Sequence, residues 1–312
     1  MYNLSMIYYV MAPLSMLSSL FIMVTFLKFP QQLFSTRATH LQFVFFQSFC
    51  DFMFSTKFLL TAVFLKSEWI RSGTVPFTPI ISPNSTMDEE MDVICVGFGV
   101  FGQFFMIASV TWNLMVSIQI LNLFWFKSYE YSIAETNSPR STLFYHLFVW
   151  GFSLATAVVP AVWGQYGATT NGCWVQETFL LTRLMIFVLP LCLFTFFSLM
   201  ILLFTLSKMK LISLRVMYVQ KLGDTDSSNT YPTLRLFITY TIVFITFWTC
   251  PVILRVLELV HRQPAFLVYG DIVSISSQGL ANAIVWATSP YVRALFKKKS
   301  NYDSINSFEE WK

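Results

Sequence analysis

The chain has 312 residues, of which 55% are hydrophobic and 12% are charged, and its formal net charge is +4 at pH 7. Soluble domains carry about 25% charged residues, so a purely soluble protein is excluded. A membrane-spanning helix takes about 20 apolar residues. Seven such helices and their short connections would account for the chain, and we expect no separate catalytic or binding domain.

Runs without charged residues locate the spans, because an ionised group at the bilayer centre costs about 2.5 to 3.5 kcal/mol on insertion scales. The runs predict an all-α membrane protein, a seven-helix bundle with spans at residues 5–27, 41–65, 93–126, 143–166, 178–206, 234–258 and 266–290. Residues 1–290 then form the transmembrane domain. Residues 291–312 are predicted to form a short cytoplasmic amphipathic helix and a tail.

Lysine and arginine are concentrated on one side of the predicted bundle. Fourteen of the twenty fall on this side: thirteen in the segments that follow spans one, three, five and seven, and Arg235 at the start of span six. Short cytoplasmic loops carry this excess, and anionic membrane lipid attracts it. The sequence therefore predicts a multi-pass protein of the plasma membrane with its N-terminus outside. Asn3 and Asn84 each begin an Asn-x-Ser/Thr sequon on the predicted outside, and both are candidate glycosylation sites.

Two of the five cysteines, Cys95 and Cys173, fall at predicted outer positions, where disulfides form and persist. A disulfide between them would tie the loop after span four to the start of span three; the alternative is two shielded free thiols. Cys50, Cys192 and Cys250 lie inside spans and are expected to pack as small apolar residues. The three histidines are spread along the chain, so we expect no metal site and no cofactor.

Polar residues inside the spans must face the interior of the bundle, because lipid offers them no partner. They include Asp51 in span two, Asn113 in span three, and Gln278 and Asn282 in span seven. Such residues either join the helices by hydrogen bonds or form a conformational switch. Trp248 and Pro251 in span six belong to the candidate switch, because proline weakens the helix and allows a hinge.

A second group of charged residues lies toward the outer ends of the spans. Its members are Lys57, Glu177, Arg183, Arg255, Glu258 and Asp271, and all of them except Glu177 are candidate ligand-binding residues. They are either ion pairs at the membrane interface or the lining of a ligand pocket that opens to the outside. In the second case the three cations favour a small anionic ligand.

Several stretches resemble G-protein-coupled receptors, and more specifically the slime-mould cyclic-AMP-receptor-like group, with a more distant similarity to secretin-like receptors. Residues 48–51 read Ser-Phe-Cys-Asp, 108–112 read Ala-Ser-Val-Thr-Trp, 173–174 read Cys-Trp, and 278–286 read Gln-Gly-Leu-Ala-Asn-Ala-Ile-Val-Trp. The rhodopsin-like Asp-Arg-Tyr triplet is missing after span three. Span seven ends in Thr-Ser-Pro-Tyr at residues 288–291 rather than Asn-Pro-x-x-Tyr, so rhodopsin-like switch residues cannot be transferred.

The resemblance implies a receptor that binds an extracellular ligand within the helical bundle and activates a heterotrimeric G protein by helix movement. A cyclic nucleotide is the ligand that it suggests. Basic residues on the inner side are candidate contacts for the G protein: Lys208, Lys210, Arg215, Lys221 and Arg293. Positive-inside topology is the alternative explanation for these residues.

A small-solute transporter or channel is the main alternative class, although the inverted repeats of many transporters are not detected. Membrane enzymes are not expected. A zinc hydrolase needs clustered histidines, an intramembrane aspartyl protease needs two facing aspartates, and both patterns are missing. A retinal photosensor needs a lysine in span seven, and residues 265–290 contain none. No nucleic-acid polymer is expected as a partner.

Overall fold

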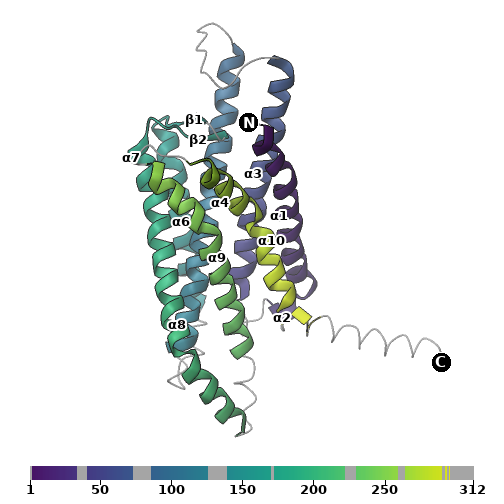
Figure 1. The fold of residues 1–312 in the computed structure, drawn as a ribbon, viewed down its shortest axis with the longest axis vertical. Helices are drawn as coiled ribbons and strands as arrows, with labels where there is room; N and C mark the ends of the chain where they lie inside the picture. The colour runs from purple at the N-terminus through teal and green to yellow at the C-terminus, as the bar shows by residue number, and fades with distance from the viewer. Residues whose placement is uncertain are drawn as a thin grey trace, which may run out of the picture.

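The computed structural model describes residues 2–33, 41–72, 86–125, 139–169, 172–221, 230–258, 264–289, 292–293 and 295. Seven long helices pack side by side in this part of the chain (Figure 1). They are α1 (Tyr2–Lys28), α3 (Gln42–Ser72), α4 (Thr86–Trp125), α6 (Pro139–Val162), α8 (Leu189–Lys221), α9 (Thr230–Glu258) and α10 (Ala265–Thr288). The short elements are α2 (Pro30–Leu33), strands β1 (Tyr166–Thr169) and β2 (Gly172–Val175), α7 (Leu180–Arg183) and the π-helical turn η3 (Leu184–Val188).

Six helices within the described residues are long and apolar enough to cross a membrane, and α10 is not among them. The six are α1, α3, α4, α6, α9 and the continuous segment from α7 to α8. Asp271, Gln278 and Asn282 lower the hydropathy of α10, although the helix has 24 residues. These three side chains are buried against the other helices. The polar residues that make α10 less hydropathic than the other six helices therefore face the interior of the bundle.

Several helices begin or end away from the limits of the predicted spans. Helix α4 begins at Thr86, before the span predicted from residue 93, and α8 continues to Lys221, beyond the predicted end at residue 206. Residue 166, the predicted last residue of span four, lies in strand β1. Hydropathy marks only the apolar part of a helix, and backbone hydrogen bonds continue a helix past the hydrocarbon layer.

Helix α4 occupies the centre of the bundle. It packs against α3, α6, α8, α9 and both strands. In the membrane span of α4, 56% of the residues are buried. The corresponding share for α6 is only 22%, because α6 packs mainly on α4. Helix α1 closes the other side of the bundle against α3 and α10. Side chains of α4 therefore contact four of the other six long helices and the hairpin.

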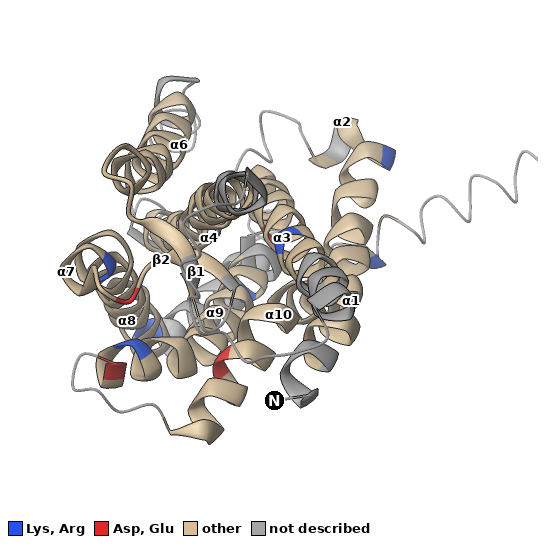
Figure 2. Cartoon of the chain, turned by 90° about the horizontal axis from the view of Figure 1, so that it is seen from above, with Lys and Arg blue, Asp and Glu red and all other residues tan. Residues whose placement is uncertain are grey.

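The antiparallel strands β1 and β2 lie at the same end of the bundle as the start of α1, and α10 ends at the other end (Figure 1). We call these the hairpin end and the opposite end. In the register, Tyr166 pairs with Val175 and Ala168 with Cys173. Seen from the hairpin end, acidic and basic residues gather beside the strands, among α7, α8 and α9 (Figure 2).

Burial in this bundle differs from that in a soluble protein, because apolar side chains cover the outside as well as filling the core. Large apolar side chains such as Leu147, which is 65% exposed, cover the outside of the helices, while Gln47 and Ser109 are buried. Lipid solvates apolar side chains but offers no hydrogen bonds. The arrangement therefore suits a bilayer.

Candidate functional site

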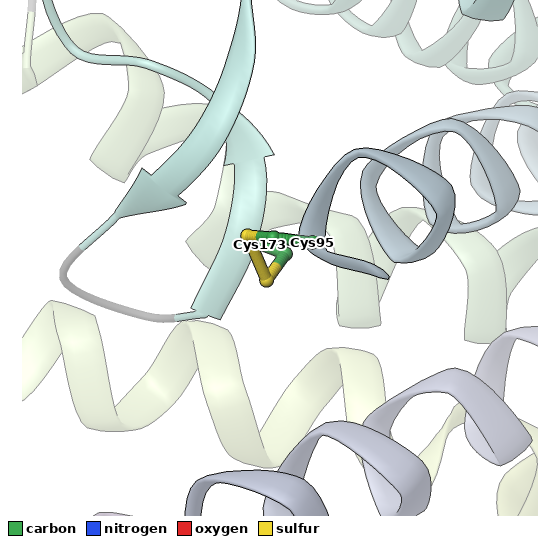
Figure 3. Close-up of a disulfide and its surroundings, with 2 residues drawn as sticks. All are labelled: Cys95 and Cys173. Carbon is green, nitrogen blue, oxygen red and sulfur yellow. A yellow bond between two sulfur atoms is a disulfide. The ribbon is translucent and has the colours of Figure 1, made fainter. Parts of the chain in front are cut away.

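The β1–β2 hairpin is fixed to the centre of the bundle by a covalent bond. Cys173 in β2 forms a disulfide with Cys95 near the hairpin end of α4 (Figure 3). This confirms the predicted pairing. The Tyr166 hydroxyl donates a hydrogen bond to the Ala157 carbonyl oxygen of α6 at 3.1 Å. Burial raises the pKa of the Tyr166 phenol well above its usual range, so the hydroxyl keeps the proton that it donates.

Trp174, the residue after Cys173, is held from α4. Its indole Nε1 donates to Gln103 Oε1 at 2.7 Å, and Gln103 Nε2 donates to the Ile186 carbonyl oxygen in η3 at 3.3 Å. Gln103 of α4 therefore links the π-helical turn η3 to Trp174 and positions the indole ring.

Two guanidinium groups contact the ring of Trp174. The Arg183 Cζ lies 4.9 Å from a ring centroid and the Arg255 Cζ lies 5.3 Å from it, within the range of cation–π interactions. Arg183 also donates from Nε and Nη2 to the Val175 carbonyl oxygen, at 2.8 and 2.6 Å. Trp174 thereby links α7 and α9 to the hairpin.

Arg255 is the centre of a buried ionic cluster between α9 and α10. Its Nη1 lies 2.6 Å from Glu258 Oε1, and its Nη2 lies 3.0 Å from Asp271 Oδ2. The side chains are 12%, 11% and 5% exposed for Arg255, Glu258 and Asp271, respectively. We call these three residues the Arg255 cluster. A buried charge that loses its partner is strongly destabilising, so the cluster constrains how the two helices meet.

Lys57 on α3 is a buried cation of a different kind. It is 7% exposed, and among the described residues no carboxylate lies within 4.0 Å of its ammonium. The ammonium contacts the ring of Phe58, 5.0 Å from its centroid. Its methylene chain crosses α4 at Gly102, where a Cβ would lie 3.0 Å from Lys57 Cε. Glycine at this position therefore leaves the space that the lysine side chain occupies.

These groups surround one pocket at the hairpin end, with an empty volume of about 750 Å³ that includes the space open to solvent. All five charged residues predicted for a ligand site line it: Lys57, Arg183, Arg255, Glu258 and Asp271. The apolar part of the lining includes Phe54, Phe58, Met106 and Phe187. Ion pairing and the lining of a pocket, the two interpretations of the outer charges, therefore both apply. Three of these residues form ion pairs, and all five line the cavity.

Below the pocket, Asp51 of α3 joins three helices. It accepts a hydrogen bond from Ser109 of α4 at 2.6 Å and another from Asn282 of α10 at 2.8 Å. The Asn282 carbonyl oxygen accepts a bond from the Tyr240 hydroxyl of α9 at 3.2 Å. The structure therefore brings together Asp51 and Asn282, which are 231 residues apart in the chain.

The polar network continues along α4 toward the opposite end. Gln47 Nε2 donates to Asn113 Oδ1 at 3.0 Å, and Asn113 Nδ2 donates to the Ser109 carbonyl oxygen at 3.0 Å. The Ser117 hydroxyl lies 3.0 Å from that of Ser198 on α8 and 3.4 Å from that of Thr241 on α9. Polar contacts thus connect α4 with α3, α8 and α9 through the middle of the bundle.

The other predicted switch residues lie between the pocket and this network. Trp248 is buried and contacts the rings of Phe187 and Phe244, with centroid separations of 6.5 and 6.3 Å. Pro251 is buried one turn before Arg255 on α9. Gln278 is buried on α10, and its Nε2 has no hydrogen-bond partner among the described residues.

The predicted G-protein contacts lie toward the opposite end. Lys208 and Arg293 are exposed. The backbone of α8 continues through residues 210, 215 and 221, past the end of the bundle (Figure 1). The side chains of Lys210, Arg215 and Lys221 are outside the described part. Asn3 lies in α1, but its side chain is not described, and Asn84 lies outside the described residues.

Sequence reasoning missed the residues that organise the pocket without carrying charge. Gln103 and Tyr8 are examples: Gln103 positions Trp174, and Tyr8 lines the pocket while stacking on Phe58 at 4.9 Å. The only signal in the sequence was the Cys-Trp pair at 173–174. No group of three or more His, Cys, Asp or Glu that could hold a metal occurs in the described part of the chain.

Comparison with known proteins agrees with this architecture. The model of the Frizzled/Smoothened family membrane region matches residues 2–269. Squid rhodopsin has a similar structure, with a TM-score of 0.63 and 16% identity over 96% of this chain and 85% of the rhodopsin chain. At that identity the likeness concerns the fold alone.

Two relatives come from Dictyostelium discoideum. Cyclic AMP receptor-like protein F is 30% identical over 327 aligned residues, which cover 96% of this chain and 95% of the relative. Cyclic AMP receptor-like protein A is 25% identical over 113 residues, which cover 36% of this chain and 28% of the relative. These matches confirm the resemblance to the cyclic-AMP-receptor-like group. This chain belongs to the Frizzled/Smoothened family and is a G-protein-coupled-receptor-like membrane protein related to the cyclic AMP receptor-like proteins.

Proposed function

We propose that this protein is a plasma-membrane receptor that binds a small extracellular ligand in the pocket at the hairpin end and activates a heterotrimeric G protein at the opposite end. The observation that carries the proposal is the position of the pocket. It is lined by charged residues from α3, α7, α9 and α10. Below it, the polar network around Asp51 connects α3, α4 and α10 by hydrogen bonds.

The proposed orientation places the hairpin end outside the cell. The disulfide at this end supports it, because the cytosol keeps thiols reduced. The exposed basic residues Lys208, Arg235 and Arg293 lie toward the opposite end, as expected for a cytoplasmic surface. The sequons at Asn3 and Asn84 remain predicted glycosylation sites on the proposed outside.

A cytoplasmic amphipathic helix after α10 remains part of the proposal. Residues 292–293 and 295 have helical backbone. Val292 is buried and Leu295 packs against the apolar core, whereas Arg293 is exposed. This alternation places one face on the bundle and leaves the basic residue free to meet anionic lipid or a G protein.

Helix α9 offers a route from ligand to G protein. A ligand that contacts Arg255 competes with Glu258 and Asp271 for its guanidinium, which changes how α9 meets α10. Pro251 lies one turn below and removes a backbone hydrogen bond there, so the helix can bend at this point. Trp248 and Thr241 lie further along α9, in contact with η3 and α4. Movement of α9 would therefore alter the packing of the opposite end.

The proposed ligand carries an anionic group, because the Lys57 ammonium lines the pocket and has no carboxylate within 4.0 Å among the described residues. Cyclic AMP is the first compound to test, given the name of the relatives. The experiment is guanine-nucleotide exchange on a panel of G proteins in membranes that contain this chain, with cyclic nucleotides and other small anions as ligands. We expect exchange that depends on both ligand and receptor.

Two variants sharpen this experiment. Lys57→Gln removes a pocket cation and should abolish the response at an unchanged protein level. Thr249→Val is the matched control, because Thr249 is exposed on α9 and its hydroxyl, within the described part of the chain, bonds only the Ile245 carbonyl of its own helix. Ligand-dependent solute uptake without nucleotide exchange would refute the receptor proposal and favour a transporter.

A further inference from the structure

Acidic and basic residues are equally numerous in the described lining of the pocket. Its described lining contains three cations, Lys57, Arg183 and Arg255, and three carboxylates, Glu177, Glu258 and Asp271. A ligand with a single charge would leave that charge uncompensated in a largely buried site. Burying a net charge is costly in a low-dielectric environment.

The three cations are not equally available to a ligand. The Arg255 guanidinium already pairs with Glu258 and Asp271. Arg183 donates two N–H groups to the Val175 carbonyl oxygen. Lys57 has no carboxylate within 4.0 Å among the described residues, although it is 7% exposed. It is therefore the cation best placed to receive an anionic group.

One acidic group has a free acceptor as well. Asp271 bonds Arg255 through Oδ2, while its buried Oδ1 has no hydrogen-bond partner among the described residues. A buried carboxylate oxygen without a donor is unfavourable. A ligand ammonium would supply both the donor and the opposite charge.

Between these polar groups the lining is apolar, with Phe54, Met106, Phe187 and Ile275. An uncharged hydrocarbon or aromatic body fits this surface. We propose that the ligand is a small zwitterion of the amino-acid type, with its carboxylate at Lys57, its ammonium at Asp271 and an apolar side chain against these residues. This inference rests on the proposed function, because it names the ligand class of the same pocket.

The test uses the full chain in lipid nanodiscs and four forms of one compound. The probes are L-phenylalanine, its N-acetyl form (anion only), its amide (cation only) and the N-acetyl amide (uncharged). Dissociation constants come from titration of the thermal unfolding midpoint. We expect L-phenylalanine to bind about tenfold or more tightly than either singly charged form, because both charges find a partner.

Two variants test which residue binds the carboxylate of the ligand and which binds its ammonium. In Lys57→Gln, L-phenylalanine should bind no better than its amide binds the unmodified protein. In Asp271→Asn, which keeps an oxygen for Arg255, it should bind no better than the N-acetyl form. Thr249→Val should leave all four constants unchanged. Unfolding without ligand checks that each variant is folded, and Lys57→Arg, which keeps the charge, provides a second test at that position.

The proposal is overturned if a singly charged form binds as tightly as L-phenylalanine, or if no form binds. Nucleotide exchange separates this from the proposed function. Exchange driven by cyclic AMP without binding of L-phenylalanine would refute the zwitterion and leave the receptor intact. Binding with the predicted charge pattern but no exchange on any G protein would support the zwitterionic ligand and refute the proposed activation of a G protein.

Discussion

The Arg255 cluster makes a quantitative prediction about what holds α9 against α10. Replacing Arg255 by glutamine removes the cation that pairs with Glu258 and Asp271, whose side chains are only 11% and 5% exposed. Removing one partner of a buried ion pair costs about 3–5 kcal/mol. Asp271→Asn should cost less, about 1–3 kcal/mol, because Arg255 keeps Glu258 and the amide oxygen still accepts a hydrogen bond.

A double-mutant cycle isolates the interaction between the two helices. The free energy of unfolding is measured by SDS titration in mixed micelles for the unmodified chain, both single variants and the double variant Arg255→Gln/Asp271→Asn. We expect the double variant to be more stable than the sum of the single effects implies, by about 0.5–3 kcal/mol. The control is Thr249→Val, on the exposed face of the same helix, which should change stability by less than about 0.5 kcal/mol.

Additive single effects, within about 0.5 kcal/mol, would refute the reasoning. They would mean that the 3.0 Å contact between Arg255 Nη2 and Asp271 Oδ2 contributes nothing to the packing of α9 on α10. The proposed route from the pocket to Pro251 would then lose its starting point, because a ligand could gain nothing by releasing Asp271 from Arg255.

Three further predictions concern other parts of the bundle. Gly279→Val should lower the free energy of unfolding by about 1–3 kcal/mol. A Cβ at Gly279 would meet the side chains of Ser15 and Ser19 and lie 2.9 Å from the Ser15 carbonyl oxygen. The control is Gly151→Ala, where nothing lies within 4 Å, and it should be neutral or stabilising in the same unfolding assay. Cys95→Ser and Cys173→Ser should each lower stability by about 2–5 kcal/mol, because each removes the disulfide. The double variant should lose no more than either single one; a larger loss would mean that the two cysteines stabilise the protein separately. Gln103→Leu should destabilise by about 1–3 kcal/mol and weaken ligand binding, because the Ile186 carbonyl and the Trp174 indole both lose their partner; unchanged binding would contradict the role given to Gln103.

Much of the architecture was predictable because hydropathy is a local property. Charge-free runs indicated the helices, and the position of Cys95 and Cys173 at the same predicted face indicated their disulfide. Polar residues within apolar runs, such as Asp51 and Asn282, had to face the interior, and the structure joins them by a hydrogen bond. These inferences need only the sequence, since lipid applies the same constraint to every residue along a span.

The organisation of the pocket could not be predicted in this way. Arg255 and Glu258 are three residues apart, and their pairing is a local possibility, whereas the pairing of Arg255 with Asp271 requires two helices in a particular rotation. The placement of Trp174 against both guanidinium groups depends on the disulfide and on Gln103 of α4. From residue order alone it follows that charged residues gather at one end of a helical bundle. Which of them neutralise each other, and why Lys57 has no carboxylate partner among the described residues, depends on how the helices pack.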